Sequence, residues 1–236
     1  MISIITPNLN NAKYLEDNIL SISKLSIPFE HIVVDGGSTD ESLELVAKYP
    51  HIKLVKQTEK TGMYGAIDLG IKDAVGEIVT WVNADDRIIS SGYEKMYKTI
   101  TSSGVDFVYS DGYYHYTNDN YKKKGKGRRF AKFFLKHGLM PAIQPACLYT
   151  IYIYKSVGGL NFNKFKIVGD LDLFLKIAQT KGSRFKYIST LSVIFMKRGD
   201  SLGDMNMKLY LKEIKENRLP TPSLVVRAIF FLFKYI

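Results

Sequence analysis

Cysteine is almost absent from this 236-residue chain, and no apolar run is long enough to cross a bilayer. The single cysteine, Cys147, excludes an intrachain disulfide and a cysteine-rich zinc site. The first residues lack the basic region and long apolar core of a signal peptide, and no stretch approaches the ~20 apolar residues of a membrane span. We therefore expect a protein of a reducing, cytosolic setting without a transmembrane helix.

Histidine and acidic residues are also scarce. The four histidines, His31, His51, His115 and His137, show no metal-ligand spacing, so we expect structural or surface roles for them. Asp and Glu number 23 against 33 Lys and Arg, and the net charge of +10 indicates a polyanionic or phosphorylated ligand, or an anionic membrane face. No aromatic-basic recognition motif accompanies the basic residues, so no nucleic-acid partner is expected.

What the chain does contain is a regular alternation of apolar strands and helical patterns in its first 90 residues. The expected strands are 2–6, 30–35, 52–56 and 77–82, and the helices between them are 15–25, 41–49 and 66–74. Alternation of this kind, with short links, predicts parallel strands joined by right-handed crossovers. The fold class is therefore α/β, and the only tryptophan, Trp81, lies in the fourth strand and is expected in the core.

The second half of the sequence has a less regular pattern. We expect helices at 90–103, 130–136, 170–178 and 205–217, strands at 107–116, 144–154 and 185–196, and a mobile basic loop at 118–129. One domain over 1–218 with an appendage at 219–236 accounts for this pattern.

Polar residues stand where three of the first four strands end. Thr6, Pro7 and Asn8 close the first strand, Asp35 closes the second, and Asp85-Asp86 close the fourth. Because parallel strands present their carboxyl ends at one rim, where open α/β folds bind ligands, these residues predict a nucleotide site. Paired carboxylates there suit Mg²⁺ or Mn²⁺ with a phosphate, although Asp-Asp alone is also typical of a solvated turn.

Five motifs then occur in a characteristic order over residues 1–200. They are Val33–Asp40 (VVDGGSTD), Gly62-Met63-Tyr64 with Ala66 and Gly70, Asn83–Asp86 (NADD), Gln144-Pro145 and Gly169–Leu173 (GDLDL). In this order they make the chain resemble a family 2-type glycosyltransferase of GT-A fold, similar to bacterial enzymes of capsule, O-antigen or exopolysaccharide assembly. The resemblance implies a mostly parallel sheet sandwiched by helices, with a nucleotide-binding half (1–89) and an acceptor half (90–218).

The resemblance also implies a role for each strand-end residue. Asp35 would hold the nucleobase of a nucleotide-sugar donor, in a pocket lined by Thr6, Pro7 and Asn8. Asp85 would lie near the ribose, and Asp86 would bind the divalent cation, Mn²⁺ or Mg²⁺, that bridges the diphosphate.

The expected catalytic residue is Asp170, which matches the position of the base that deprotonates the acceptor hydroxyl in inverting transfer. A carboxylate before a helix is also a common N-cap, and this is the alternative for Asp170. Asp172 points elsewhere on a helix and ranks second. Further expected phosphate or acceptor contacts are Arg198, Gln144 and Tyr64.

The chain departs from the family pattern at several positions. Gly169 stands where many relatives carry Glu, and Ile143 stands where a His often precedes Gln. Close relatives often have Asp and Asn at the positions held here by Gly65 and Asp68. These departures bear on acceptor contacts rather than on the donor half.

Two segments carry charge or apolar surface without an assigned role. The basic stretch 122–129 would contact donor phosphates, an anionic lipid-linked acceptor or a membrane, or would be a solvated loop. The tail 219–236 is almost continuously apolar after Ser223, with Arg227 and Lys234 as its only charges. It predicts an interfacial membrane helix at the inner face of the cell membrane, or a segment that docks onto the domain or a partner.

Taken together, the residues and the resemblance predict metal-dependent transfer of a sugar from a nucleotide-diphosphate donor to a hydroxyl of a glycan or lipid-linked acceptor. UDP as the nucleotide and inversion at the anomeric carbon are what the resemblance implies. A nucleotidyltransferase is one alternative, but it requires a glycine- and basic-rich loop after the first strand, and Thr6–Asn11 (TPNLNN) does not provide one. A non-catalytic module that binds membranes or polyanions is the other alternative.

Overall fold

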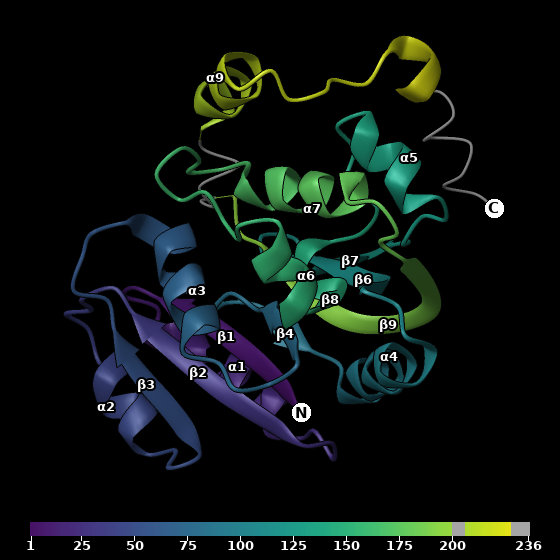
Figure 1. Ribbon diagram of the computed structural model, residues 1–236. Helices are drawn as coiled ribbons and strands as arrows, with labels where there is room; N and C mark the ends of the chain where they lie inside the picture. Colours follow the sequence, from purple (N-terminus) through teal and green to yellow (C-terminus); the bar gives the residue numbers. More distant parts are fainter. Residues whose placement is uncertain (200–205, 228–236) are drawn as a thin grey trace.

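The structure, a computed structural model, describes residues 1–199 and 206–227 and forms one mixed sheet with helices on both faces (Figure 1). Its strands are β1 (Ile2–Asn8), β2 (Phe29–Asp35), β3 (Ile52–Lys56), β4 (Ile78–Trp81), β5 (Arg87–Ile88), β6 (Phe107–Tyr116), β7 (Tyr121–Gly125), β8 (Cys147–Thr150) and β9 (Phe185–Lys197). They lie in the order β3-β2-β1-β4-β8-β6-β9-β5, and β7 pairs with β6.

The first half of the sheet is parallel, as the sequence predicts. β1 lies between β2 and β4, and β3 is the outer neighbour of β2. The helices α1 (Ala12–Ile22), α2 (Ser42–Ala47) and α3 (Gly62–Lys72) connect these strands. The register pairs Asn8 with Asp35, so two of the predicted rim residues are direct neighbours.

The second half reverses direction and makes the sheet mixed. β8 is antiparallel to both β4 and β6, whereas β9 runs parallel to β6. The two-residue strand β5 pairs with β9 immediately after the Asp85-Asp86 turn. The helices of this half are α4 (Ser90–Ser103), α5 (Ala131–Lys136), α6 (Ile151–Ser156), α7 (Gly169–Gln179) and α9 (Met207–Glu216).

Two predictions for the second half were wrong. The basic segment 118–129 is not wholly a loop, because it contains β7. The apolar run 144–154 is not one strand: it divides into a 3₁₀ turn η1 (Gln144–Ala146), β8 and α6. The Thr150 hydroxyl accepts from the amide of Ile153 at 3.2 Å and begins α6 as an N-cap. Apolar runs alone do not distinguish a buried strand from a buried helix.

The core fills both faces of the sheet. On one face α3, α5, α6 and α7 pack around Trp81, which is 1% exposed. The Phe174 ring on α7 lies 6.2 Å from Trp81 and 4.8 Å, edge-on, from Phe107. On the other face α1, α2 and α4 cover the sheet through two smaller clusters. Packing of the core therefore fixes the end of β4, from which the turn that carries Asp85 and Asp86 starts.

The chain after α9 is described only as far as residue 227. Leu219 packs against the main core, and the Ser223 hydroxyl accepts from the amide of Val226 at 3.3 Å, as expected of a helix cap. Leu224 and Val225 are 83% and 69% exposed. Most of the apolar tail lies in residues 228–236, outside the described residues. None of the helices within the described ranges has the length and apolar character to cross a membrane.

Candidate active site

The first rim group joins β1 to the turn that follows β2. The Asn8 amide donates to Asp35 Oδ1 at 3.0 Å and to Ser38 Oγ at 3.1 Å. Asp35 also accepts from the Ser38 hydroxyl at 2.5 Å and from the amides of Gly37 and Ser38 at 3.0 and 2.9 Å. Gly37 has a φ of +96°, which favours glycine and lets the turn fold back onto the carboxylate.

These contacts determine the ionisation of Asp35. Burial alone would raise the pKa of its carboxyl group, but the hydrogen bonds from Ser38, Asn8 and Gly37 together lower that pKa below its ordinary value. Asp35 is thus an ionised carboxylate that organises the turn. The Asn8 Oδ1 atom is buried and has no hydrogen-bond partner among the described residues, so an incoming N–H donor would satisfy it.

Thr6 lies in the interior behind this rim. Its hydroxyl bonds with His31 Nε2 at 2.9 Å and with Asn18 Oδ1 at 3.3 Å. Burial, followed by the charge of His51, lowers the pKa of His31 to about 3, so the ring is neutral. The amide of Asn18 donates to the carbonyls of Asn83 and Asp86 at 3.0 and 2.9 Å. Thr6 and Asn18 therefore fix the turn after β4, and the half-buried Pro7 contributes its backbone to the rim.

The two aspartates of that turn face different environments. Asp86 is 1% exposed, and its Oδ1 accepts from the amide of Met196 on β9 at 2.9 Å. Asn83 donates to its Oδ2 at 3.4 Å. Burial, and then the charge of Asp85, raise the pKa of Asp86 well above its ordinary value. Without a bound cation, this environment favours the neutral form of the Asp86 carboxyl group.

Asp85 is the more accessible of the two. Its Oδ2 lies 3.2 Å from Arg198 Nε, and the two side chains are 18% and 20% exposed. The Arg198 guanidinium lies 4.7 Å from the centre of the Tyr14 ring. The sequence assigns the metal to Asp86 and the ribose to Asp85; of the two carboxylates, Asp86 is the more buried and Asp85 the more accessible.

The described residues contain no group of three or more His, Cys, Asp or Glu side chains able to hold a metal. A nucleotide-bound Mg²⁺ usually needs only one or two protein carboxylates, because phosphate oxygens and waters complete its coordination. Asp85 fits that requirement, with hard oxygen ligands at a rim that also holds a cation, Arg198, suited to phosphate.

Asp170 occupies the first turn of α7. Its Oδ1 accepts from the amide of Leu171 at 2.8 Å and from the Tyr64 hydroxyl at 3.3 Å. The N-cap of α7 is Val168, so the alternative that Asp170 is a simple N-cap does not hold. Burial raises the pKa of Asp170 to about 6. A carboxylate with that pKa is suited to accept a proton near neutral pH.

The Tyr64 ring packs against Gly169, next to the Asp170 carboxylate. A Cβ atom at position 169 would lie 2.7 Å from Tyr64 Cε2, which is closer than real Cβ contacts come. The glycine that replaces the family's Glu thus makes room for the Tyr64 ring. Asp172 pairs with Lys176 at 2.6 Å, and Gln144 donates to the carbonyl of Trp81 at 3.1 Å.

The predicted residues thus fall into two groups. Asn8 and Asp35 contact each other, and Asn18 links Thr6 to Asp86. Tyr64 of α3 and Asp170 of α7 form the second group. Sequence reasoning missed Asn18 and Glu213, which are polar residues on the buried faces of α1 and α9. That placement is the only signal by which they could have been found.

The comparison with protein families decides the identity. The model of glycosyl transferase family 2 matches residues 3–157, well over half of the chain. The chain belongs to glycosyl transferase family 2. The predicted family is confirmed, and the nucleotidyltransferase alternative has no support from the match.

Relatives of this family 2 chain include bacterial proteins. It is 32% identical over 121 residues to the glycosyltransferase GlyG of Streptococcus pneumoniae serotype 4, covering 49% of this chain and 40% of GlyG. It is 36% identical over 93 residues to the poly(ribitol-phosphate) beta-N-acetylglucosaminyltransferase TarS of Staphylococcus aureus, covering 36% of this chain and 16% of TarS. The chain thus spans less than half of these relatives.

Solved structures agree on the fold of this family 2 chain. Residues 1–349 of S. aureus TarS, in complex with UDP, align with a TM-score of 0.67 and 22% identity over 90% of this chain and 65% of that chain. The mannosyltransferase PcManGT of Pyrobaculum calidifontis, in complex with GDP-Man and Mn²⁺, aligns with a TM-score of 0.65 and 18% identity over 92% of this chain and 63% of that chain. The predicted GT-A fold is confirmed.

Proposed function

We propose that this family 2 chain transfers a sugar from a nucleotide-diphosphate donor, with UDP as the nucleotide, to a hydroxyl group of a glycan or lipid-linked acceptor. The observation that carries the proposal is a set of polar side chains suited to bind a donor, together with a carboxylate suited to act as a base. Asn8, Asp35 and the paired aspartates lie on one side, and Asp170, with its pKa raised by burial to about 6, lies in the other half. The TarS structure with UDP-GlcNAc and the PcManGT structure with GDP-Man support a nucleotide-sugar donor.

The donor half would bind the nucleotide at the ends of β1 and β2. Asn8 Oδ1, which lacks a partner among the described residues, would accept an N–H of the base, and Asp35 would keep the turn in place. Arg198 would exchange its contact with Asp85 for the diphosphate, which carries more concentrated charge. Asp85 would be the protein ligand of a divalent cation. A cation bound there would offset the charge that develops on the leaving diphosphate.

The transfer step would be a single displacement. The acceptor oxygen attacks the anomeric carbon, the bond from that carbon to the diphosphate oxygen breaks, and the nucleoside diphosphate leaves with the electron pair. The hydroxyl proton passes to Asp170. The deprotonated base is needed, so the raised pKa of Asp170 keeps it a competent proton acceptor close to neutral pH. Inversion at the anomeric carbon is part of this proposal.

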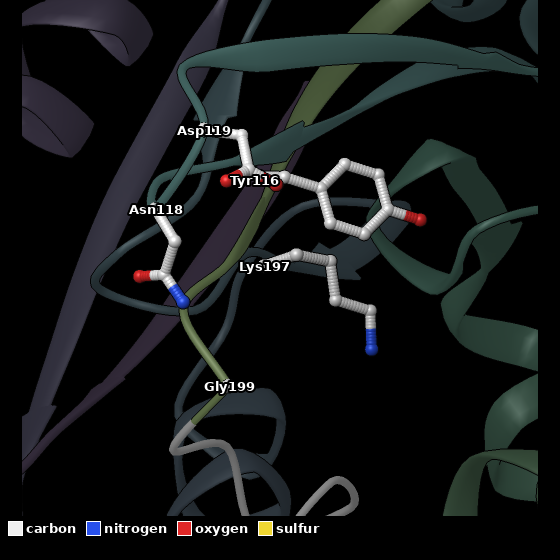
Figure 2. Close-up of a pocket in the computed structure, with 5 residues that line it drawn as sticks. All are labelled: Tyr116, Asn118, Asp119, Lys197 and Gly199. Atoms are coloured by element: carbon white, nitrogen blue, oxygen red, sulfur yellow. The ribbon is translucent and has the colours of Figure 1, made fainter.

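The acceptor would approach across the β6–β7 hairpin. Its lysines Lys122, Lys123 and Lys124 are exposed. Figure 2 shows Tyr116 and Lys197 side by side over a hollow that Asn118, Asp119 and Gly199 also line. Lys197 pairs with Tyr116, and Lys123 pairs with Tyr114 two residues earlier on β6, so these two lysines lie on the same face of the sheet and give it a basic surface. An anionic glycan or a phosphate-linked lipid carrier, as in cell-surface polysaccharide synthesis, would complement its charge.

A peripheral contact of 219–236 with the inner face of the membrane belongs to the same proposal. The exposed Leu224 and Val225 support it within the described residues. A chain that ends before Pro220 should lose its partitioning to vesicles containing an anionic phospholipid. Equal partitioning of the full and shortened chains would remove the membrane contact.

A thermal-shift experiment tests the donor proposal. The full chain should melt at a higher temperature with UDP and Mn²⁺ than with either alone, because a ligand that binds only the folded state stabilises it. Asp85→Asn should abolish the Mn²⁺-dependent part, whereas Asp86→Asn should keep it. Asp73→Asn, an exposed aspartate paired with Lys53, is the matched control.

Three outcomes count against the proposal. Absence of any nucleotide-dependent shift, with UDP or GDP and their sugars, overturns the donor assignment. If Asp86→Asn loses the Mn²⁺-dependent shift in melting temperature and Asp85→Asn keeps it, the metal ligand is Asp86 and not Asp85. A nucleotide-sugar that binds but releases no nucleoside diphosphate with any acceptor would leave a binding module instead of an enzyme.

A further inference from the structure

A buried carboxylate from the last described long helix supports the segment that leads into Asp170. Glu213 of α9 is 4% exposed. Its Oε1 accepts from the amide of Lys166 at 2.7 Å, and its Oε2 accepts from the amides of Ile167 and Val168, both at 3.1 Å. Three charge-assisted hydrogen bonds to consecutive backbone amides fix the path of this segment.

Tyr64 of α3 contacts the same segment through a backbone carbonyl of that segment. Its hydroxyl donates to the carbonyl of Ile167 at 2.7 Å and lies 3.3 Å from Asp170 Oδ1. Residues 166–168 are therefore bonded through their amides to one helix and through a carbonyl to another. Asp170 follows after only Gly169, and so the position of its carboxylate depends on both contacts.

Glu213 also acts as a helix cap for α7, whose own N-cap residue does not provide one. The N-cap residue of α7 is Val168, whose side chain cannot accept a hydrogen bond. Its amide is one of the three that donate to Glu213. The negative charge lies at the positive end of the α7 dipole, where it is favourable. A glutamate located more than 40 residues further along the chain thus takes the place of a local helix cap.

We propose that Glu213 is a positioning residue for Asp170, holding the candidate base in the geometry needed for proton transfer. This inference rests on the proposed function, because it assumes that Asp170 is the base. It assigns a catalytic consequence to α9, which lies outside the part of the chain matched by the family model. Glu213 itself touches no substrate in this proposal.

The experiment compares Glu213→Gln with Glu216→Gln in the full chain. The glutamine keeps the shape and one acceptor oxygen of Glu213, but it loses the charge and the second acceptor. Glu216 lies on the same helix, is 61% exposed and only approaches Lys212 at 3.8 Å, so its variant controls for the change of charge. We expect kcat for transfer to fall about 10- to 100-fold in Glu213→Gln, as for misplaced catalytic groups. The donor KM should stay within about twofold, because the donor half is untouched.

The pH profile gives a second readout that a purely structural role would not move. Burial raises the pKa of Asp170, and a loosened segment should admit more water to this carboxyl group, so its pKa should fall and the acid limb of kcat should move to lower pH. Among the described residues, the other titratable groups that interact with Asp170 are Tyr64, Tyr210 and Cys147. The pKa of each is raised, with burial as the largest cause, so all three stay protonated over this limb. Glu216→Gln should leave the limb in place.

The outcomes separate this inference from the function on which it rests. If Asp170→Asn transfers sugar at the wild-type rate, the base assignment fails, and the Glu213 inference fails with it. If Asp170→Asn is inactive but Glu213→Gln keeps the wild-type kcat and acid limb, only the Glu213 inference fails. A fall in kcat that is matched by a lower melting temperature and weaker UDP binding also overturns it. If Glu213→Gln does not fold, Glu213→Asp replaces it, with the same split between kcat and KM expected.

Discussion

Arg198 Nε lies 3.2 Å from Asp85 Oδ2, so the more accessible of the two neighbouring aspartates is held by a cation of the protein itself. The Tyr14 ring supports the guanidinium from α1. The pair neutralises two charges at a rim that is mostly shielded from water. In the proposed complex, a diphosphate with its cation would offer a better partner to each of them, since both interactions would be charge-assisted and bidentate contacts would become available.

Replacing Arg198 tests this exchange. Arg198→Ala should weaken binding of UDP with Mn²⁺ about 10- to 100-fold, the effect of losing one charge-assisted hydrogen bond. Titration calorimetry measures the change. Arg87→Ala removes an arginine that pairs with the exposed Asp17 instead, and its affinity should match that of the wild type. Equal UDP affinity in Arg198→Ala and Arg87→Ala would mean that Arg198 does not contact the phosphates.

Asp170→Asn should lower kcat by roughly 10²- to 10⁴-fold, the contribution expected of a general base. UDP affinity should not change. In the wild type, kcat should rise with pH through about 6, the pKa to which burial raises Asp170, because the base must be ionised. A profile without an acid limb near that pH would contradict the assignment.

The same carboxyl group should cost stability at neutral pH. The folded-state pKa of Asp170 is about 6, above the ordinary 3.8. Its contribution to the free energy of unfolding is therefore present in full below pH 3.8 and is lost as the pH rises through 6. Asp170→Asn should therefore be more stable than the wild type at pH 7.5 by about 1–3 kcal/mol, and should show no such gain near pH 3.8. Urea unfolding at both pH values measures it. A loss of stability at pH 7.5 would show that the raised pKa is not the dominant effect.

Asn18 should matter to both stability and donor binding. Its side chain bonds with Thr6 and with the carbonyls of Asn83 and Asp86. Asn18→Ala removes a side-chain donor from the Asp86 carbonyl and one of the two partners of the Thr6 hydroxyl and of the Asn83 carbonyl, and should cost about 1–3 kcal/mol of unfolding free energy. UDP binding should weaken as well, because the turn that carries Asp85 loses its support. Asn163→Ala, at an exposed position, should change neither quantity. Intact UDP affinity in Asn18→Ala would show that the turn holds its shape alone.

The exposed lysines of β7 give a test of the acceptor surface. Lys122→Glu with Lys123→Glu should raise the KM for an anionic acceptor several-fold and leave the donor KM unchanged, because only one substrate crosses the hairpin. Lys95→Glu with Lys98→Glu makes the same change of charge on exposed residues of α4. An equal rise in acceptor KM in both pairs would indicate a long-range effect of net charge instead of a contact.

The local patterns of the sequence predicted much of this fold. The bounds of β3, α4 and β6 match those expected, because each is an uninterrupted pattern bounded by turn residues. The rim at the ends of β1 and β2 also follows from the βα alternation alone. Such features depend on neighbours in the chain.

The features that sequence reasoning missed depend on distant partners. β5 is two residues long and exists only because β9 lies beside it. Asp86 is buried because Met196 and Asn83 satisfy its carboxyl oxygens, and its neighbour Asp85 is left more accessible. Glu213 contacts a segment 45 to 47 positions away. No period or propensity in a single sequence encodes those contacts.

The hydrogen bond from Met196 to Asp86 spans 110 positions, and this has a consequence for synthesis on the ribosome. At about 5–20 residues per second, the Asp85-Asp86 turn waits roughly 5–20 s for the strand that completes it. During that time the parallel half can assemble while the Asp86 carboxylate stays hydrated. We expect donor affinity to arise late, after the chain has passed β9. A nascent chain stalled at residue 180 should not retain UDP, and retention there would refute the delay.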